Sequence, residues 1–177
     1  MHASVRDWIA AQLPLIEGAN VIDLGSLDVN GSVRPLVGVL KPVEYVGVDL
    51  RVGVGVDVVG DVCSGFLKDC YGKFDIVISA ETLEHVQTWP LFVHEMKRLA
   101  KPGGHLLLTC RSPGFALHNH PGDYWRFTVD DLRQAFRDCA LLDSQEDPEA
   151  SGAFLHATKP PEWIDSGPTW ATVSAAT

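Results

Sequence analysis

The sequence predicts an α/β fold in which a doubly wound, mostly parallel sheet carries helices on both faces and is closed by an antiparallel hairpin. Two observations lead to this prediction. Short runs rich in β-branched residues alternate with helical segments along most of the chain, which is the pattern of such a sheet. The last two apolar runs are separated by too few residues for a crossover helix, so they must pair in opposite directions.

Five short apolar runs are the predicted parallel strands. They span residues 20–25, 44–50, 56–62, 74–80 and 105–110. Between the last two, residues 91–100 carry apolar side chains at helical spacing, and a breaker cluster at residues 101–104 ends this helix. A later helix is expected to begin after Thr128, because Thr128 and Asp131 match a capping box with Asp in place of Glu.

The end of the chain differs from the rest. Residues 140–147 and 152–158 are joined by only a few turn-forming residues, so they are the predicted antiparallel hairpin. We therefore predict one domain over residues 1–158. Residues 159–177 are rich in Pro, Ser, Thr and Ala and show no periodicity, so we expect them to form a loosely ordered tail.

Length and composition limit what the protein can be. A chain of 177 residues can bury one core without a disulfide or a structural metal. The 14 Lys and Arg residues against 23 Asp and Glu residues leave a net charge of −9, which makes nucleic acid a poor expected partner. The four cysteines form no CxxC pair, so we expect buried or idle thiols in a reducing compartment.

No run approaches the ~20 apolar residues needed to cross a bilayer, and the N-terminal segment lacks the pattern of a secretory signal. We therefore expect a cytoplasmic protein with no membrane partner. The sequence carries no signal for an oligomeric state.

Four of the predicted parallel strands end in polar residues or glycine, at the edge of the sheet where ligands bind in this kind of fold. The positions are Asp23 with Gly25, then Asp49, then Asp61, and last the group Ser79, Ala80 and Glu81. A carboxylate after the second strand can accept hydrogen bonds from both hydroxyls of a ribose. Each position alone is typical of a turn or a cap, but four in register predict a nucleotide-like cofactor.

Five segments, in this order and spacing, resemble the class I S-adenosylmethionine-dependent methyltransferases, in particular the small-molecule group called type 11. They are VIDLGS, YVGVDL, VVGDV, FDIVISAETLEHV and LAKPGGHLLLT. The resemblance covers roughly residues 3–158 and implies a Rossmann-like domain with S-adenosylmethionine as the cofactor. A nicotinamide enzyme is the competing use of the fold, but the glycines fit GxGxxG badly.

The resemblance also implies which residues bind the cofactor. Asp23, Gly25 and Ser26 line its methionine side, Asp49 binds the ribose between Leu50 and Arg51, and Asp61 with the Val62 backbone receives the adenine. We add Asn30, Ala80 and Glu81 to the predicted cofactor site.

The first loop departs from the family pattern of an acidic residue followed by three alternating glycines. Leu27 and Val29 occupy the second and third glycine positions. We interpret the loop as rebuilt, with its tight turn moved to Asn30 and Gly31, which both tolerate positive φ. This interpretation requires Leu27 and Val29 to turn away from the cofactor. Arg34, just beyond, is expected to pair with a surface acid.

The long segment after the fifth strand is expected to cover the methyl acceptor, because loops of this length are often functional lids. It supplies the candidate catalytic residues His118, His120 and Tyr124. Histidine is the usual general base near neutral pH. Asp123 with Arg126 is expected to pin the loop.

Glu81, Glu84 and His85 have the spacing of one helical face and are types that ligate metals. Some relatives, including small-RNA 2′-O-methyltransferases, bind a divalent ion through a similar pattern. We favour a site without metal, in which Glu84 and His85 cap and brace a helix. In the metal alternative, His118 or His120 completes the ligand set.

The predicted function is transfer of a methyl group from S-adenosylmethionine to an oxygen or nitrogen of a small molecule or a glycan-related metabolite. Two alternatives are kept. One is a catalytically silent domain that binds the cofactor or a partner protein, as the altered loop suggests. The other is a metal-dependent RNA 2′-O-methyltransferase, which the acidic net charge disfavours.

Overall fold

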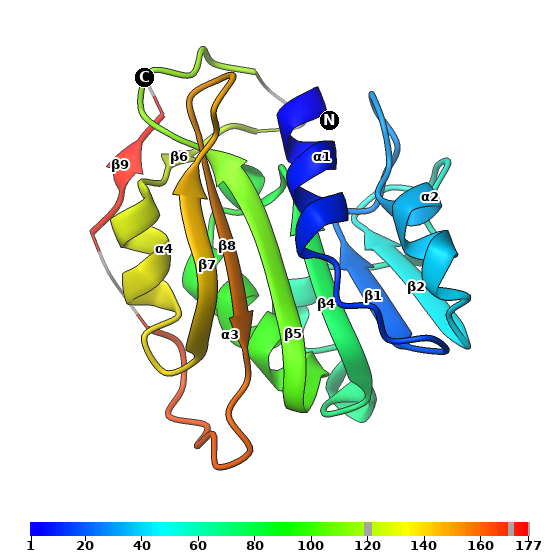
Figure 1. Cartoon of the computed structure of the whole chain (residues 1–177). Helices are drawn as coiled ribbons and strands as arrows, with labels where there is room; N and C mark the ends of the chain where they lie inside the picture. The colour runs from blue at the N-terminus through cyan, green and yellow to red at the C-terminus, as the bar shows by residue number, and fades with distance from the viewer. Residues whose placement is uncertain (119–121, 170–171, 177) are drawn as a thin grey trace.

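A seven-stranded mixed sheet forms the centre of the chain (Figure 1). The computed structural model describes residues 1–118, 122–169 and 172–176. The strand order is β3-β2-β1-β4-β5-β8-β7. The strands are β1 (Asn20–Leu24), β2 (Glu44–Asp49), β3 (Val58–Val59), β4 (Phe74–Ala80), β5 (Ala100–Arg111), β7 (Ala140–Glu146) and β8 (Gly152–Thr158). β1 to β5 run parallel, and β8 pairs antiparallel with both β5 and β7, which confirms the predicted sheet and its closing hairpin.

The strand order reverses at β1. β1 pairs with β2 on one side and with β4 on the other, so consecutive strands of the chain leave it in opposite directions. Crossovers on the two sides diverge at the carboxyl end of β1, and the space between them is the usual ligand crevice of an open α/β sheet. The topology therefore places the predicted cofactor residues of β1, β2 and β4 around one opening.

Helices cover both faces of the sheet (Figure 1). They are α1 (Ala3–Gln12), α2 (Arg34–Val37), α3 (Trp89–Leu99) and α4 (Val129–Ala135), with short 3₁₀ turns η1 (Gly38–Leu40), η2 (Val62–Ser64), η3 (Lys68–Cys70) and η4 (Leu83–His85). Side chains of α3 and α4 belong to one buried cluster, and those of α1 and α2 to a second cluster on the other face. None of the helices in the described part of the chain is long and apolar enough to cross a membrane.

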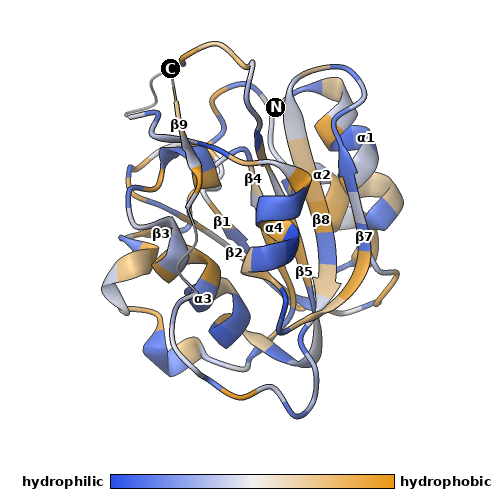
Figure 2. Ribbon diagram, turned by 90° about the vertical axis from the view of Figure 1, so that its left-hand side faces the viewer, coloured by the Kyte–Doolittle hydropathy of each residue, from blue (hydrophilic) through white to orange (hydrophobic). Residues whose placement is uncertain are grey.

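Local sequence signals account for the helix ends. Thr128 accepts a hydrogen bond from the Asp131 amide and the Asp131 carboxylate accepts from the Thr128 amide, which is the predicted capping box. α3 ends at Leu99, one residue before the predicted position. Apolar residues are concentrated in the central strands, while α4 shows its polar side to solvent (Figure 2). This is the amphipathic pattern of a helix on a sheet.

The segment after β8, which the sequence analysis expects to be loosely ordered, makes defined contacts in its described part. The Trp163 indole donates to Asp138 over 2.7 Å, and His94 lies 3.1 Å from Asp165. Further on, β9 (Ser174–Ala175) pairs with β6 (Trp125–Arg126) as a small second sheet. The segment therefore runs across α3 and returns to the loop that precedes α4.

A pair of histidines, buried His156 and half-buried His105, lies between β5, β8 and α1. His105 Nδ1 is 2.9 Å from His156 Nε2, and His156 Nδ1 is 3.0 Å from the Gln12 side chain. His156 is 4% exposed. Burial, with a smaller effect of His105, lowers its pKa to about 4. The folded protein therefore holds His156 neutral, while the unfolded chain protonates it near the ordinary pKa of about 6.5.

Acidification should therefore destabilise the protein through His156. The folded pKa lies below the unfolded one, so the unfolded chain binds more protons between these values and stability falls as the pH decreases through this window. Between pH 7.5 and pH 4.5 this contribution is about 2 kcal/mol. Urea unfolding of the wild type and of His156→Gln at both pH values measures it. The variant should lose less stability on acidification, and an equal loss in both proteins would contradict the assignment.

Candidate active site

A cavity of about 700 Å³ opens at the carboxyl ends of the parallel strands. Every residue predicted to bind the cofactor lines it. These residues are Asp23, Gly25, Ser26, Asn30, Asp49, Leu50, Arg51, Asp61, Val62, Ala80 and Glu81. The fold thus gathers positions from four strand ends, separated by up to 58 residues in the chain, around one space.

Gly25 allows the chain to leave β1 against the next wall of the cavity. It has φ +86°, and a Cβ added there would lie 2.0 Å from Thr82 Oγ1. The amides of Gly25 and Ser26 both donate to the Val48 carbonyl of β2, at 2.8 and 3.1 Å. Ser26 is buried, and its hydroxyl oxygen has no hydrogen-bond partner in the described part of the chain. Ser26 lines the cavity, and its hydroxyl oxygen lies beside Gly47 of β2.

The rest of the first loop differs in part from the expected arrangement. Gly31 has φ +129°, but Asn30 is not in the left-handed region, so the turn needs positive φ only at the glycine. The Asp28 carboxylate stabilises this turn by accepting from the Gly31 amide over 2.7 Å. Leu27 and Val29 both line the cavity. The Leu27 side chain packs against Gly53, which is not one of the residues that line the cavity.

Asp23 is buried inside β1 and is held by β2. The Tyr45 hydroxyl donates to its carboxylate over 2.7 Å, and burial raises the pKa of Asp23 to about 7. The Arg34 guanidinium stacks 4.2 Å from the Tyr45 ring and forms an ion pair with Asp57. Arg34 thus pairs with a partly exposed acid, as expected from the sequence.

The carboxylates of Asp49 and Asp61 each have a structural role as well as a place on the cavity. Asp49 accepts from the Leu27 amide at 3.3 Å and from the Arg51 amide at 3.0 Å. Asp61 begins η2 by accepting from the Cys63 amide over 2.9 Å. Asp49 therefore joins the first loop to the end of β2, on the side where a ribose is predicted.

A buried arginine that the sequence analysis did not single out forms the wall opposite β2. Arg111, at the end of β5, is fully buried and lines the cavity. Its guanidinium forms ion pairs with Glu81 and, at 3.3 Å, with Asp147. Glu81 has φ +56°, which is rare for a non-glycine residue. The sequence does carry a signal for Arg111, because this charged residue directly follows the last of the predicted parallel strands.

Residues of the loop between β5 and α4, which the sequence predicts to cover the acceptor, border the cavity. Two of its predicted catalytic residues, His118 and Tyr124, line the cavity, while His120 lies outside the described residues. Asp123 pins the loop as expected, accepting from Arg126 Nη2 over 2.7 Å. Burial raises the pKa of Asp123, but the bonds from Arg126 and from the His118 amide lower it to about 2.

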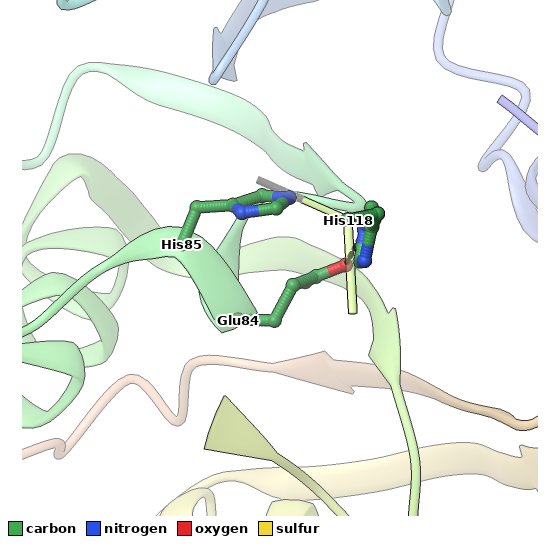
Figure 3. Close-up of side chains that lie close together, drawn as sticks. All are labelled: Glu84, His85 and His118. Atoms are coloured by element: carbon green, nitrogen blue, oxygen red, sulfur yellow. Dashed lines mark ion pairs between the residues drawn. The ribbon is translucent and has the colours of Figure 1, made fainter. Parts of the chain in front are cut away.

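Glu84, His85 and His118 lie close together at this end of the cavity (Figure 3). The prediction that Glu81, Glu84 and His85 share one helical face is wrong, because η4 is a single 3₁₀ turn and Glu81 pairs with Arg111 instead. Glu84 is fully buried, and burial raises the pKa of its carboxyl to about 8. His85 Nδ1 contacts the Gly122 carbonyl.

The comparison with protein families decides what kind of domain this is. Residues 1–144 match the family described as the methyltransferase domain. The chain belongs to this methyltransferase family. No curated protein matches the sequence closely.

Solved structures agree with the methyltransferase fold. An S-adenosylmethionine-dependent methyltransferase from Mesorhizobium loti has a TM-score of 0.69 at 17% identity, covering 89% of this chain and 98% of that one. The 1,6-didemethyltoxoflavin N1-methyltransferase of Burkholderia thailandensis, with S-adenosylhomocysteine bound, has a TM-score of 0.65 at 19% identity, covering 89% and 79%. A chain from the Haloferax volcanii complex between the Trm112 activator and its proposed methyltransferase partner reaches 0.70 at 18% identity, covering 90% of each.

The cofactor of this methyltransferase is S-adenosylmethionine, and the residues present fit it. A Cβ at Gly25 would clash with Thr82 of the cavity lining, and the Ser26 hydroxyl oxygen is buried without a hydrogen-bond partner in the described part of the chain. The cavity is within the size range of small-molecule and cofactor sites, about 300–1,000 Å³.

Gly25→Ala should destabilise the methyltransferase more than Gly65→Ala. Both glycines have positive φ, which costs alanine about 1–2 kcal/mol, but only at Gly25 would the new Cβ meet other atoms within 4 Å. Thermal unfolding of the two variants separates the clash from the backbone effect. We expect a melting temperature for Gly25→Ala several degrees below that of Gly65→Ala, and equal values would show that Thr82 moves aside freely.

Proposed function

We propose that this methyltransferase transfers a methyl group to an oxygen or nitrogen of a small molecule or a glycan-related metabolite. One observation carries the proposal: the predicted cofactor residues and the acceptor-side residues His118 and Tyr124 line the same cavity. A donor and an acceptor can therefore meet within it. A small acceptor suits a cavity of this size bordered by residues from several loops.

The cofactor half of the cavity follows the order of the strands. We propose that Ser26 and Gly25 contact the methionine part, that Asp49 accepts hydrogen bonds from the ribose hydroxyls, and that Asp61 with the Val62 backbone receives the adenine. Glu81 has one buried carboxylate oxygen without a hydrogen-bond partner in the described part of the chain. We assign this oxygen to the amino group of the cofactor.

The acceptor half is built by the loop after β5. Tyr124 is partly exposed on the cavity, while its backbone amide is fixed by a 2.9 Å bond to the Glu84 carbonyl. Its hydroxyl is placed to orient an acceptor. Both ring nitrogens of His118 face carboxylates, with Nδ1 at 3.0 Å from Asp123 and Nε2 at 3.9 Å from Glu84. His118 is thus held in place at the same end of the cavity.

Methyl transfer mainly requires that the acceptor atom is aligned with the methyl group of the cofactor. The sulfonium of bound S-adenosylmethionine is itself a strong methyl donor. The protein then contributes by holding the acceptor atom in line with the methyl group, and alignment of this kind contributes on the order of 7–11 kcal/mol. The pinned loop and the rigid strand ends supply the two fixed sides that alignment needs.

A second candidate function is a silent domain that binds the cofactor without methyl transfer. The identities of Leu27 and Val29 favour it, because both residues line the cavity at positions where the family pattern has glycine. An RNA acceptor is disfavoured by the net charge of −9.

Calorimetric titration with S-adenosylhomocysteine tests the proposed cofactor site. We expect one binding site per chain with a dissociation constant in the micromolar range, which corresponds to about −8 kcal/mol. Absence of binding at millimolar concentration would refute the proposal. Binding without methyl transfer to a panel of phenols, amines and sugars would favour the silent domain.

Asp49→Ala should weaken S-adenosylhomocysteine binding by about 10- to 100-fold. The variant loses charged hydrogen bonds to the ribose, which contribute about 1.5–3 kcal/mol, and it frees the Leu27 amide. Asp69→Ala is the matched control, because this exposed aspartate of η3 does not line the cavity. Calorimetric titration measures the affinity of both variants for S-adenosylhomocysteine. Equal affinities would show that the ribose lies elsewhere.

A further inference from the structure

We propose that Glu84, His85 and His118 form a binding site for one divalent transition-metal ion, of the zinc type, at the acceptor end of the cavity. Each residue offers one ligand atom, and these atoms all lie within 4.8 Å of one another (Figure 3). Zinc bonds to nitrogen and oxygen are about 2.0–2.2 Å long, so ligand atoms on one ion lie roughly 3.4 Å apart. The three groups need to approach by only about 0.5–1.5 Å to share an ion.

The first independent observation is the state of Glu84. Its side chain is fully buried, and neither carboxylate oxygen has a hydrogen-bond partner in the described part of the chain. Leaving a buried polar group unsatisfied is costly, and buried charges are normally paired or bound to metals. Glu84 instead extends toward His118 (Figure 3). A bound cation would satisfy both oxygens without moving the backbone.

The second observation is that each imidazole has an oxygen atom close to its Nδ1. His118 Nδ1 lies 3.0 Å from the Asp123 carboxylate, in a contact without hydrogen-bond geometry, and its Nε2 lies 3.9 Å from Glu84. Asp123 is itself held by Arg126. His85 Nδ1 contacts the Gly122 carbonyl. Metal-binding histidines typically have one ring nitrogen on a carboxylate or backbone carbonyl, which fixes the tautomer and the ring direction.

The donor set selects the class of ion. Two imidazoles and one carboxylate suit zinc and the neighbouring first-row metals, whereas magnesium and calcium prefer oxygen ligands throughout. Glu81 would have added a second carboxylate and shifted the set toward the hard ions. It is instead committed to the buried Arg111 guanidinium. Because of this pairing, three protein ligands remain among the described residues.

Three protein ligands leave coordination positions for another group, and here the inference rests on the proposed function. His85 and His118 line the cavity that would hold the acceptor. The open position therefore faces the acceptor, and a bound hydroxyl or phenol oxygen would lose its proton more readily on the ion. In this arrangement His118 is a metal ligand and not a free base. The acceptor class narrows to molecules with an oxygen that can ligate a metal.

Calorimetry on the full chain, first treated with a chelator, tests the ion. We expect Zn²⁺ to bind with a stoichiometry of one and a dissociation constant below about 10 μM, and Mg²⁺ to bind at least about 100-fold more weakly. Co²⁺ provides a spectroscopic readout, since the site should give visible absorption of a nitrogen- and oxygen-ligated ion. Absence of Zn²⁺ binding, or preference for Mg²⁺, would overturn the proposal.

Variants test the ligand set. Glu84→Gln and His118→Gln should each weaken Zn²⁺ binding at least about 30-fold and remove the Co²⁺ absorption. His105→Gln is the matched control, because it removes a histidine at the far end of β5. It should bind Zn²⁺ as the wild type does. Equal binding by all three variants would place the ion at another site and refute the assignment.

Thermal unfolding shows whether a variant that does not bind Zn²⁺ is still folded. Without metal, Glu84→Gln should melt close to the wild-type temperature, because it replaces the buried carboxyl with an amide of the same size. With Zn²⁺ at 100 times its dissociation constant, the wild type should gain roughly 5–10 °C and the variant almost nothing. Equal gains would overturn the proposal. S-adenosylhomocysteine titration of the same samples separates the outcomes, since its binding without Zn²⁺ binding would refute the metal and retain the cofactor site.

Discussion

The close contact between Gly25 and Thr82 is the constraint on which the cavity depends. The contact joins the loop after β1 to the segment after β4, two neighbouring strands of the sheet. If these segments stood further apart, the side chains that follow Thr82 would move away from the cofactor loop. Only a residue without Cβ permits the contact at this φ. A single glycine therefore sets the distance between the proposed cofactor half and the η4 turn.

Ion pairs between buried charged side chains stabilise other parts of the cavity wall. Arg111 is paired on both sides by carboxylates, and Asp123 is paired by Arg126. Such pairs are stable only when each charge has its partner, because removing one partner leaves an uncompensated charge in a low-dielectric surrounding. Glu84 differs from these carboxylates, because neither of its oxygens has a hydrogen-bond partner among the described residues and its contact with His118 spans 3.9 Å. For this reason we propose that Glu84 binds a metal ion, whereas the other carboxylates stabilise the cavity wall through their ion pairs.

The two halves of the cavity come from different kinds of structure. The proposed cofactor half is formed by strand ends, whose positions follow from the sheet. The proposed acceptor half is formed by a loop between β5 and α4, held by side-chain contacts such as the Trp125 indole bond to the Val86 carbonyl at 3.1 Å. Loops can change without altering the sheet. On the proposed function, substrate choice is therefore separable from cofactor binding.

The sequence by itself determined the sheet, the hairpin and the cofactor edge. Periodicity marked the strands, and the spacing of Asp23, Asp49 and Asp61 marked one edge, because parallel strands bring their carboxyl ends together. These signals are local or depend on a fixed topology. Only the tertiary structure decided that Glu81 turns to Arg111 while Glu84 meets His118. Positive φ at Glu81 and a 3₁₀ turn in place of an α-helix separate the two glutamates, and such side-chain directions depend on packing between distant segments that spacing along the chain does not encode.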